Sequence, residues 1–406
     1  MEWREVRLSE IAYIQTGPFG SQLHNEDYVD EGTPIVTVEH LGNKYFTTKN
    51  LPCVSESDKE RLSKYIAQKG DIIYSRVGVV DRCSYVNDFS DGWLFSGRCL
   101  RVRVSNDIDS EFIYYALNRD IVKQFIRNIA VGATMPSINT KLLGEVPVIL
   151  PPLFTQHRIA SILSSLDSKI ELNNKINAQL EEMAQAIFKS WFVDFEPFKD
   201  GKFVESELGM IPEGWRVGTL DEVCDIVGGS TPSKSKAEYY TEQGIAWLTP
   251  KDLSVSKAKF TSKGEIDITE AGYKSTSTKL MPRGSVLYTS RAPIGYISIA
   301  KNEICTNQGF KSAVPKIAGT AFLYCYLKEM TPEIENKSTG STFKEASGSL
   351  MKSLTLAIPP QEIFNKFEEQ LQAIFSKQEI AEAESLHLSQ LRDTLLPKLM
   401  NGEIEI

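Results

Sequence analysis

The residues of this chain whose types and spacing could do chemistry lie in three short stretches rich in glycine, proline and small polar residues. These are Gly228–Tyr240, Ser290–Gly295 and Asn307–Ser312, which together carry lysine, arginine, glutamine and hydroxyl side chains. Arginine and lysine can bond a guanine edge, glutamine can pair with adenine, and serine, threonine and lysine can hold a phosphate. These residue types could therefore bond the base edges and phosphates of a nucleic acid.

Individual residues in these stretches and in other loops are candidate DNA contacts. Arg76 and Arg291 follow similar apolar stretches and are predicted to contact bases or phosphates. Lys234 and Lys236 stand beside hydroxyl residues, which indicates a phosphate-binding loop. The full predicted set is Ser21, Gln22, Lys44, Arg76, Thr134, Ser233, Lys234, Lys236, Lys251, Arg291, Gln308, Lys311, Thr342 and Lys344.

Most of these candidates have a structural alternative that the sequence leaves open. A loop arginine can bond carbonyl groups instead, and loop lysines can simply be solvated. Gln308 and Lys311 can support a buried loop, and the hydroxyls of Thr134 and Thr342 can stabilise turns. The nearby aromatic residues are favoured as core side chains rather than as DNA contacts; they are Tyr239, Tyr240 and Trp247.

The sequence predicts no catalytic residue, metal site or cofactor. It contains neither a GxxxxGK[ST] phosphate loop nor a GxGxxG turn. An amino-methyltransferase of the Asn/Asp-Pro-Pro-aromatic type needs a polar residue before its Pro-Pro pair, where this chain has Leu150 and Ile358. The four histidines have no ligand spacing and the six cysteines form no CxxC pair, which argues against a zinc site or a disulfide framework. A cytoplasmic protein with reduced thiols is expected.

An internal repeat organises the chain that must position the candidate loops. Trp3, Leu8, Glu10, Ile14 and Gly17 recur 212 residues later as Trp215, Leu220, Glu222, Ile226 and Gly229. The Gly-Ala-Thr that ends at Thr134 and the Pro151-Pro152 pair recur 208 residues later, as Gly-Ser-Thr and Pro-Pro. Because the order is preserved and the offset hardly changes, we interpret the chain as a duplicated unit, a globular domain followed by a long helix.

The globular parts are predicted to be α+β with an antiparallel or mixed sheet. Four stretches are rich in β-branched residues, show the alternation typical of strands and are separated by Gly and Pro. They are Ile35–Val38, Ile72–Tyr74, Cys99–Val104 and Val146–Leu150. The apolar spacing of Ser110–Asn118 predicts a helix.

After each Pro-Pro pair the apolar spacing becomes that of a long helix. One seven-residue row runs Ile159, Leu166, Asn173, Leu180, Ile187, with Met183 beside it, and the second runs Phe367, Ile374, Ala381, Leu388, Leu395, with Leu391 nearby. Thr155 is the expected N-cap of the first helix. Helices of roughly 35–40 residues, on the order of 55 Å long, must bury such rows, and each is the simplest antiparallel partner of the other. Asn173 is either a register device in the seam or an ordinary solvated or bonded polar residue.

The charge balance limits what the chain can do alone. Its net charge of -8 is unusual for a simple nucleic-acid binder, which normally has a basic footprint. The acidity concentrates in residues 358–406, with 4 Lys and Arg against 9 Asp and Glu, a segment expected to be helix. DNA affinity is therefore expected to depend on local basic patches and on a partner. The sequence contains no apolar run of membrane-spanning length and no apolar signal core at its start.

The most specific local sequences resemble a known family. The stretches Gly228–Tyr240, Gly244–Asp252, Ser290–Gly295 and Asn307–Ser312 look like target recognition domains of the type I restriction-modification specificity subunits. Met183–Phe192 and Leu391–Gly402 look like the ends of that family's two central helices. The resemblance covers nearly the whole chain, although Gly17–Ser21 departs from the Gly-Gly-x-Thr-Pro form found at Gly228.

The resemblance implies two similar target recognition domains separated by two long antiparallel helices. It implies a subunit without catalysis, which recognises a bipartite, asymmetric site in double-stranded DNA. Its implied partners are methyltransferase subunits and, through them, a restriction and translocation subunit. The expected boundaries are 1–152 and 206–358 for the recognition domains, and 153–205 and 359–406 for the helical segments. A fused methyltransferase, which would bind S-adenosylmethionine, and a coiled-coil scaffold or antitoxin-like protein are the competing hypotheses.

Overall fold

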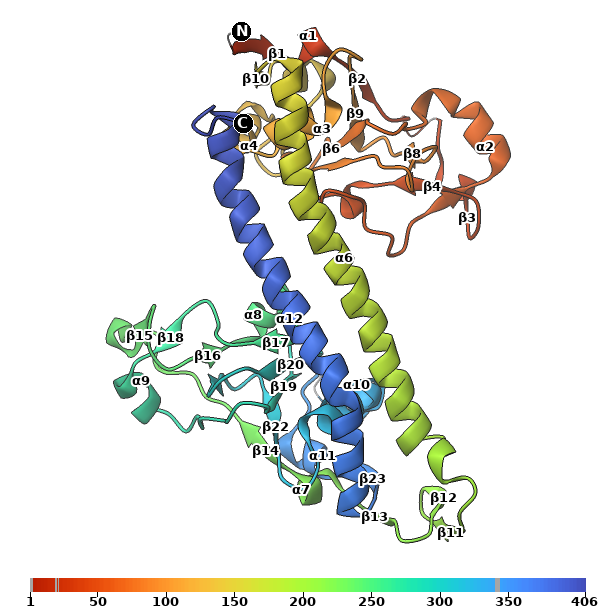
Figure 1. The fold of residues 1–406 in the computed structure, drawn as a ribbon, viewed down its shortest axis with the longest axis vertical. Coiled ribbons are helices and arrows are strands. Elements are labelled where there is room, and N and C mark those ends of the chain that lie inside the picture. Colours follow the sequence, from red (N-terminus) through yellow and green to blue (C-terminus); the bar gives the residue numbers. More distant parts are fainter. Residues whose placement is uncertain (1–2, 19, 21, 340–343) are drawn as a thin grey trace. The chain divides into compact units, whose positions relative to one another are not determined.

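The computed structural model describes residues 3–18, 20, 22–339 and 344–406, which form two compact units. Unit 1 comprises Met1–Glu171 and Leu386–Ile406, and unit 2 comprises Leu172–Ser385. Each unit mixes short helices with small sheets and contains part of two long helices (Figure 1). The predicted α+β class is therefore confirmed.

The sheets of unit 1 are mainly antiparallel. One sheet has the order β2 (Ala12–Thr16), β9 (Cys99–Val104), β6 (Ile72–Ser75), β7 (Cys83–Tyr85). The other has the order β3 (Tyr28–Val29), β5 (Cys53–Val54), β4 (Thr33–Val36), β8 (Leu94–Phe95), with β4 and β8 parallel. β1 (Arg4–Arg7) pairs with β10 (Pro147–Leu150). The short helices are α1 (Leu8–Ile11), α2 (Glu56–Arg61), α3 (Ser110–Leu117), α4 (Asp120–Ile129) and α5 (Thr140–Gly144).

Three predicted strands and the predicted helix of unit 1 are found within one or two residues of their expected bounds as β6, β9, β10 and α3. The strand predicted over Ile35–Val38 is only half correct, because β4 ends at Val36. Beyond it the chain forms a 3-10 turn, in which the Thr37 N–H donates to Nδ1 of His40 at 3.1 Å. A local side-chain bond of this kind outweighs the strand preference of two β-branched residues.

Unit 2 repeats the same elements with a wider central sheet. Its order is β14 (Cys224–Gly228), β22 (Lys311–Pro315), β19 (Val286–Ser290), β20 (Ile294–Ala300), β17 (Phe260–Thr261). Smaller pairs are β15 (Tyr240–Thr241) with β18 (Asp267–Ile268), β16 (Trp247–Leu248) with β21 (Cys305–Thr306), β13 (Arg216–Thr219) with β23 (Thr355–Ile358), and β11 (Phe203–Ser206) with β12 (Gly209–Pro212). The short helices are α7 (Leu220–Val223), α8 (Pro250–Ser256), α9 (Glu270–Lys274), α10 (Thr320–Lys337) and α11 (Gly348–Lys352).

A repeated glycine shows why the duplication is visible in the sequence. A Cβ added to Gly17 would lie 2.1 Å from the Ser96 carbonyl oxygen in unit 1. A Cβ added to Gly229 would lie 2.1 Å from the Thr306 carbonyl oxygen in unit 2. In each unit the segment leaving the first strand of the main sheet runs against the backbone that precedes the second, so only glycine fits.

The two long helices are α6 (Leu153–Phe192) and α12 (Gln361–Met400), and both follow the Pro-Pro pairs directly. The prediction of Thr155 as N-cap is wrong. The Gln156 N–H already donates to the Pro152 carbonyl at 3.0 Å, which places Thr155 inside the first turn. The Gln156 side chain also donates to the Pro151 carbonyl at 2.8 Å, so this glutamine helps to close the start of the helix.

The predicted antiparallel pairing of α6 with α12 is present in each unit. In unit 1, Ile159 and Leu163 near the start of α6 share a core with Leu399 and Met400 at the end of α12. In unit 2, Phe188 near the end of α6 packs against Phe367 near the start of α12. Burial of the two apolar rows against each other stabilises helices that would be marginal as isolated segments.

Asn173 lies in the seam of unit 2, where it is only 2% exposed. Its amide nitrogen donates across to α12, to Glu384 Oε2 at 2.8 Å and to Ser385 Oγ at 3.3 Å. These bonds exist in one register only, which favours the interpretation of Asn173 as a register device. Met183 and Leu391, in contrast, were expected beside the seam and are exposed instead.

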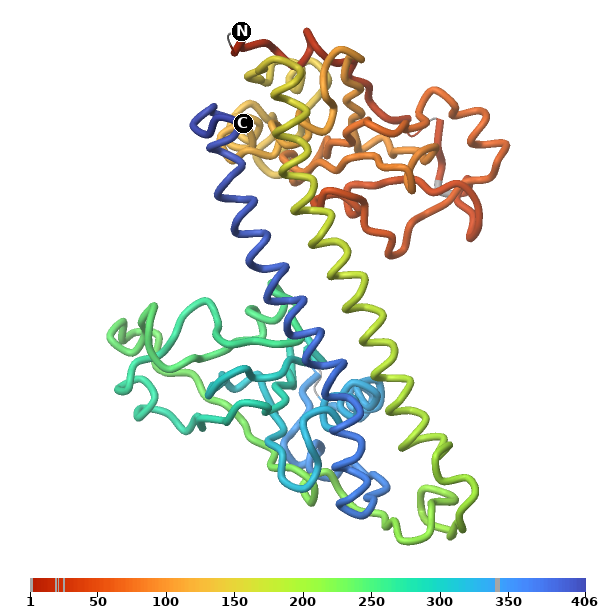
Figure 2. Tube along the Cα trace, viewed as in Figure 1, coloured from red at the N-terminus to blue at the C-terminus, as the bar shows by residue number. Residues whose placement is uncertain are grey.

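Both ends of the described chain, at residues 3 and 406, lie in unit 1 (Figure 2). Trp3 packs against the same hydrophobic core as Ile404 and Ile406. Among the described residues, no helix is both long and apolar enough to cross a membrane.

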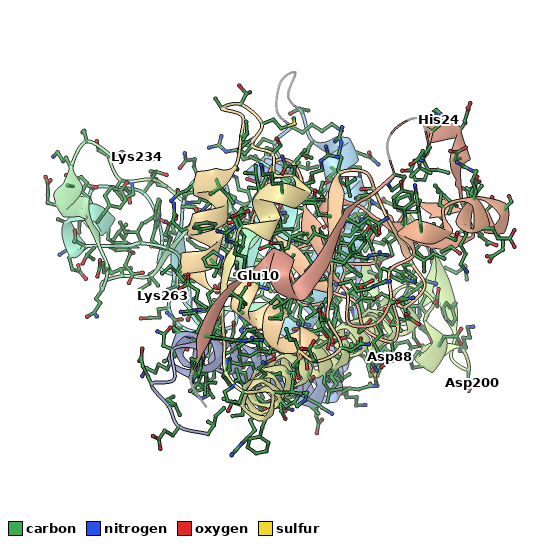
Figure 3. All side chains as sticks on the ribbon, turned by 90° about the horizontal axis from the view of Figure 1, so that it is seen from above. Glu10, His24, Asp88, Asp200, Lys234 and Lys263 are labelled. Carbon is green, nitrogen blue, oxygen red and sulfur yellow. The ribbon has the colours of Figure 1, made fainter. Side chains whose placement is uncertain are left out.

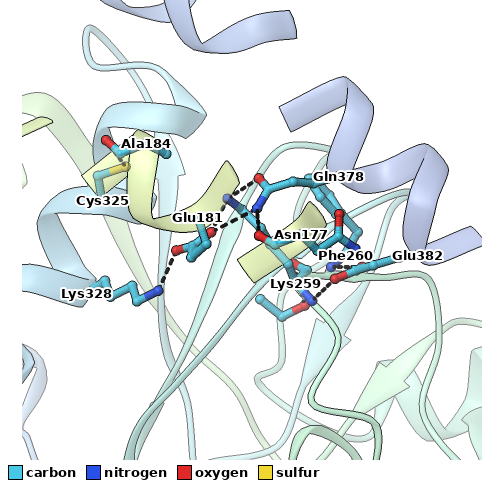
Figure 4. Close-up of polar contacts among 10 residues, drawn as sticks. Asn177, Glu181, Ala184, Lys259, Phe260, Cys325, Lys328, Gln378 and Glu382 are labelled. Atoms are coloured by element: carbon cyan, nitrogen blue, oxygen red, sulfur yellow. Dashed lines mark hydrogen bonds and ion pairs between the residues drawn. The ribbon is translucent and has the colours of Figure 1, made fainter. Parts of the chain in front are cut away.

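Lys259 fastens the main sheet of unit 2 to both long helices (Figure 4). Its ammonium group lies 2.7 Å from Glu181 Oε2 on α6 and 2.8 Å from Gln378 Oε1 on α12. The Glu382 carboxylate on α12 accepts the backbone N–H groups of Lys259 and Phe260 at 2.8 and 3.1 Å. The neighbouring β17 is thereby anchored to the helix pair.

Candidate DNA interface

Four of the predicted DNA contacts line one pocket of about 640 Å³ in unit 2. It is formed by the segment after β14, the start of α8, the turn between β19 and β20, and the turn between β21 and β22. Its predicted contacts are Lys234, Lys251, Arg291 and Gln308, and its other lining residues are Thr231, Tyr240, Trp247, Thr249, Pro250, Glu265, Ile266, Ala292, Asn307 and Gly309. Three cationic side chains and an amide therefore converge from segments that lie far apart in the sequence.

Two aromatic residues hold the loop that carries Lys234. The indole N–H of Trp247, a buried residue, donates to the Ser230 carbonyl at 3.1 Å. The hydroxyl of Tyr240 donates to the Pro232 carbonyl at 2.7 Å. Trp247 is thus a core residue, as predicted, and Tyr240 is half-buried. With the loop fixed behind it, Lys234 is exposed at the periphery of the unit (Figure 3).

Arg291 stands at the turn between β19 and β20 and is paired with a carboxylate. Its Nη1 atom lies 3.3 Å from Glu345 Oε2, and the side chain is 38% exposed. The next residue, Ala292, has a φ of 53°, a left-handed conformation that costs free energy for a residue with a Cβ. Lys311 reaches the other oxygen of the same Glu345 carboxylate, at 3.6 Å.

The other candidates of unit 2 have local partners on the surface. Lys251 pairs with Glu265 at 2.7 Å, and Gln308 accepts a hydrogen bond from the Thr231 hydroxyl. Outside the residues that line the pocket, Lys236 donates to Tyr239, Ser233 bonds Ser235, and Lys344 donates to the Glu335 carbonyl at 3.3 Å. Exposed pairs of this kind contribute little to stability and can be exchanged for contacts with phosphate.

The candidates of unit 1 are engaged in a different way. Arg76 donates from Nη1 to the Thr16 hydroxyl at 3.1 Å and to the Gly97 carbonyl at 3.2 Å. Bonds of this kind within the domain are what we expect if Arg76 stabilises its loop instead of contacting DNA. Gln22 accepts a hydrogen bond from the Tyr65 hydroxyl at 2.7 Å, and Thr134 is exposed in the segment between α4 and α5.

Lys44 does not belong to a surface that DNA could reach. Its side chain is 6% exposed, and its ammonium group pairs with Glu111 at 2.6 Å and donates to the Tyr115 hydroxyl at 3.0 Å. That hydroxyl donates to Asp167 on α6 at 2.5 Å, and burial and the Asp167 charge raise the pKa of Tyr115. A buried ammonium group needs such partners, so Lys44 is structural. Ser21 and Thr342 lie outside the described residues.

Comparison with known proteins decides the family. The model of the type I restriction modification DNA specificity domain matches residues 1–182 and 212–388, which is one match for each half of the chain. The chain belongs to the family of type I restriction-modification specificity subunits. It is therefore a DNA-recognition subunit of a restriction-modification complex, and it supplies recognition rather than catalysis.

Relatives of this specificity subunit match it over its full length or over part of it. The HindI specificity subunit of Haemophilus influenzae is 26% identical over 99% of this chain and 100% of its own. The MjaIX specificity subunit of Methanocaldococcus jannaschii is 41% identical over 40% of this chain and 38% of its own. The crystal structure of a type I S subunit from M. genitalium has a TM-score of 0.61 at 18% identity, covering 98% of this chain and 96% of that one. The last likeness shows that the fold is shared.

Sequence reasoning missed two carboxylates beside the specificity subunit's candidate contacts: Glu265, which pairs with Lys251, and Glu345, which pairs with Arg291. A carboxylate is not expected on a surface that meets phosphates, so residue type gave no signal. A signal did exist in the spacing, because Glu345 follows the repeated Gly-Ser-Thr segment of the second half. Its contact with Arg291 joins residues 54 positions apart, which only the fold can bring together.

Proposed function

We propose that this specificity subunit recognises a bipartite, asymmetric site in double-stranded DNA, with residues 1–152 reading one half-site and residues 206–358 the other. The convergence of Lys234, Lys251, Arg291 and Gln308 around one pocket is the observation that carries this proposal. Asymmetry follows from the loops, because Gly17–Ser21 and the loop that begins at Gly228 differ in sequence although they leave equivalent strands. Two frames with different loops are suited to two different sequences.

The proposed contacts of the second domain divide by residue type. Arg291, Gln308 and Lys311 are base-contact candidates, because their donors match guanine and adenine edges in the major groove. Lys234, Lys236, Ser233, Lys251 and Lys344 are phosphate-contact candidates, because they are exposed and lie in or beside loops. Arg76, Gln22 and Thr134 remain the proposed contacts of the first domain, while Lys44 is left out because it is buried.

The helical segments, residues 153–205 and 359–406, are proposed as spacer and as docking surface for methyltransferase subunits. Leu172 and Met183 on α6 are exposed apolar residues, and so are Ile380 and Leu391, which lie 208 positions later on α12. The same offset relates the two Pro-Pro pairs, so the exposed residues occupy equivalent places in the repeat. Exposed apolar residues at duplicated positions suit two copies of one partner.

The charge of the chain supports a role for these partners. With a net charge of -8, the isolated subunit is expected to bind DNA weakly, and methyltransferase subunits would add contacts to phosphate. Through them a restriction and translocation subunit would join the complex. The proposed place of action is the cytoplasm, where the target DNA lies, and no cofactor is proposed for this subunit.

Exchange of one domain tests the bipartite reading. Residues 206–358 are replaced by the equivalent domain of a relative with a different site, and methylated positions in host DNA are mapped with and without the exchange. We expect one half of the methylated sequence to change and the other to remain. The reciprocal exchange of residues 1–152 should change the other half. A change in both halves by either exchange, in a complex that still assembles, would contradict the proposal.

Docking is tested separately at the helix surface. Leu172→Asp places a charge at an exposed apolar position of α6, and Asn174→Asp places the same charge at an exposed polar position two residues away. The first variant should lose co-purification of the methyltransferase subunits on size exclusion, whereas the second should keep it. Equal retention by both variants would show that Leu172 is not part of the docking surface.

A further inference from the structure

One carboxylate in unit 2 stands between two proposed base-contact residues. Glu345 lies 3.3 Å from Arg291 Nη1 through one oxygen and 3.6 Å from Lys311 Nζ through the other. The Glu345 side chain is 39% exposed and that of Lys311 is 19% exposed. A fixed negative charge thus stands beside the two cations at the surface proposed to meet DNA.

The repeat identifies the residue that holds the same place in unit 1. There, Val131 and Ser137 form an isolated bridge, and 208 positions later Thr339 and Glu345 form the equivalent bridge. In both units, the residue that follows this bridge donates a backbone hydrogen bond to the chain at the end of β6 or β19. The Ile138 N–H donates to the Arg76 carbonyl, and the Ala346 N–H donates to the Ser290 carbonyl, both at 2.9 Å. Ser137 is therefore the counterpart of Glu345, and the first domain has no carboxylate at this position.

The carboxylate changes how the second domain can bind DNA. A phosphate that binds Lys311 would come close to the Glu345 carboxylate, and the two negative charges would repel each other. The phosphate can therefore bind only if Glu345 moves away or is neutralised. A base edge can instead accept from Arg291 while the guanidinium keeps its contact with Glu345, because guanidinium has several donors in a fixed plane. Binding that uses phosphate alone is disfavoured, and binding that uses base contacts is retained.

We propose that Glu345 is a specificity-determining residue of the second domain. It acts as a positioning residue, which holds Arg291 for base contact and keeps Arg291 and Lys311 from serving nonspecific phosphate binding. The inference rests on the proposed role of Arg291 as a base contact. The two domains would then discriminate between the cognate site and nonspecific DNA in different ways, because Ser137 in unit 1 carries no charge.

The test uses the full-length subunit assembled with its methyltransferase partners. Equilibrium binding is measured, over a range of salt concentrations, to three duplexes. These carry the site found by methylation mapping, the same site with its second half altered, and no site. Glu345→Ser installs the residue of the first domain, and Glu345→Gln removes the charge but keeps an acceptor for Arg291. Glu303→Ser, at an exposed position between β20 and β21 and outside the helical segments, is the control for loss of one negative charge.

Both Glu345 variants should bind the duplex without a site about 10-fold more tightly. For that duplex, the slope of log affinity against log salt concentration should become steeper by about 0.9. This is the change expected for one additional phosphate contact. Glu345→Ser should lower the ratio of cognate to nonspecific affinity about 10-fold, and Glu345→Gln should retain more of the discrimination against the altered second half. Glu303→Ser should change neither quantity.

Two outcomes would overturn the inference. Glu345→Ser could leave the affinity ratio within twofold of the unmodified subunit, or it could weaken all three duplexes equally, which would indicate a structural role. Arg291→Ala separates this failure from failure of the proposed function. If Arg291→Ala abolishes discrimination at the second half-site while Glu345→Ser does not affect it, only the role of Glu345 is wrong. If neither variant affects it, the proposed interface is wrong.

Discussion

The ammonium group of Lys259 lies 2.7 Å from the Glu181 carboxylate, and its side chain is 6% exposed. Lys259 stands beside β17 of the recognition domain and Glu181 belongs to α6. The ammonium group also lies 3.6 Å from the centre of the Phe375 ring on α12. A single buried cation therefore ties the domain to both helices of unit 2.

This pair makes stability depend on pH. Burial alone would raise the pKa of Glu181, but the charges of Lys259 and Lys328 outweigh it and hold that pKa at about 2. A carboxyl whose folded pKa is below its ordinary value stabilises the fold above that value. Stability from Glu181 is therefore complete above about pH 5 and is lost as the pH falls from the ordinary value of 4.5 toward 2.

We predict that Glu181→Gln destabilises unit 2 at pH 7 by about 3 kcal/mol, because it leaves a buried cation without its anion. The variant should then lose less additional stability between pH 5 and pH 3 than the unmodified chain. Guanidinium unfolding at several pH values measures both effects. Glu182→Gln, at the exposed neighbouring position, should leave both unchanged. If the stabilities of the Glu181→Gln variant and the unmodified chain fell in parallel as the pH is lowered, Glu181 would not be responsible for the loss of stability at acid pH.

Arg291→Ala should weaken recognition of the second half-site. Loss of a bidentate base contact costs roughly 1–3 kcal/mol and relaxes the requirement at one base pair. Competition binding with singly altered duplexes measures the cost at each position. Arg283→Ala, at an arginine that does not line the candidate pocket, is the matched control and should have no effect. Uniform weakening on every duplex would assign Arg291 to phosphate, and unchanged binding would make it structural.

Gly229→Ala should disrupt the loop that carries Lys234. The new Cβ would meet the carbonyl oxygens of Thr306 and Asn307 at 2.1 and 2.2 Å, and backbone cannot move aside as a side chain can. We expect a destabilisation of about 1–3 kcal/mol and loss of second half-site recognition. Gly228→Ala is the matched control, because its nearest new contact is the flexible Lys311 side chain at 3.9 Å. Equal melting temperatures and equal binding of the two variants would contradict the prediction.

Insertion of four residues between Asn173 and Asn177 should lengthen the unread spacer of the DNA site. Four residues add about 6 Å along a helix and nearly preserve its buried face. That length is comparable to two base-pair rises of about 3.4 Å. We expect a spacer one or two base pairs longer, with both half-site sequences unchanged, in methylation maps.

A two-residue insertion at the same place is the control, since it turns the following helix by about 200° and should disrupt the helix pair. If the four-residue variant folds and still methylates at the original spacing, the helices do not set the distance. Residues 197–214 between α6 and the second domain would then be the segment to vary.

Much of the fold was predictable, because it is encoded in neighbouring residues. β9 and α3 were found at or within one residue of their expected bounds, because β-branched alternation and helical spacing are local signals. The start of α6 was misplaced by three residues, because Thr155 has the side chain of an N-cap whereas the helix already begins at Leu153. The exposure of Met183 was missed, because Ala184 and Phe188 take the buried face.

The candidate site was predictable only in part. Lys234, Lys251, Arg291 and Gln308 were identified by residue type in polar loops, and they line one pocket. Lys44 satisfied the same criterion and is buried. Residue type cannot separate a solvated lysine from one that a distant tyrosine and carboxylate receive into the interior, because the desolvation of an ammonium group is compensated by partners remote in the chain.

The sequence by itself determined the duplication, the two long helices and the family, because each depends on periodicity, spacing and residue type along the chain. The tertiary structure alone decided which polar residues share a surface and what they contact there. Arg291 is paired with Glu345, Lys311 reaches the same carboxylate, and Lys44 is withdrawn into the core. The reason is physical: electrostatic and hydrogen-bond partners act over a few ångströms in space, and the fold brings them together from positions many residues apart.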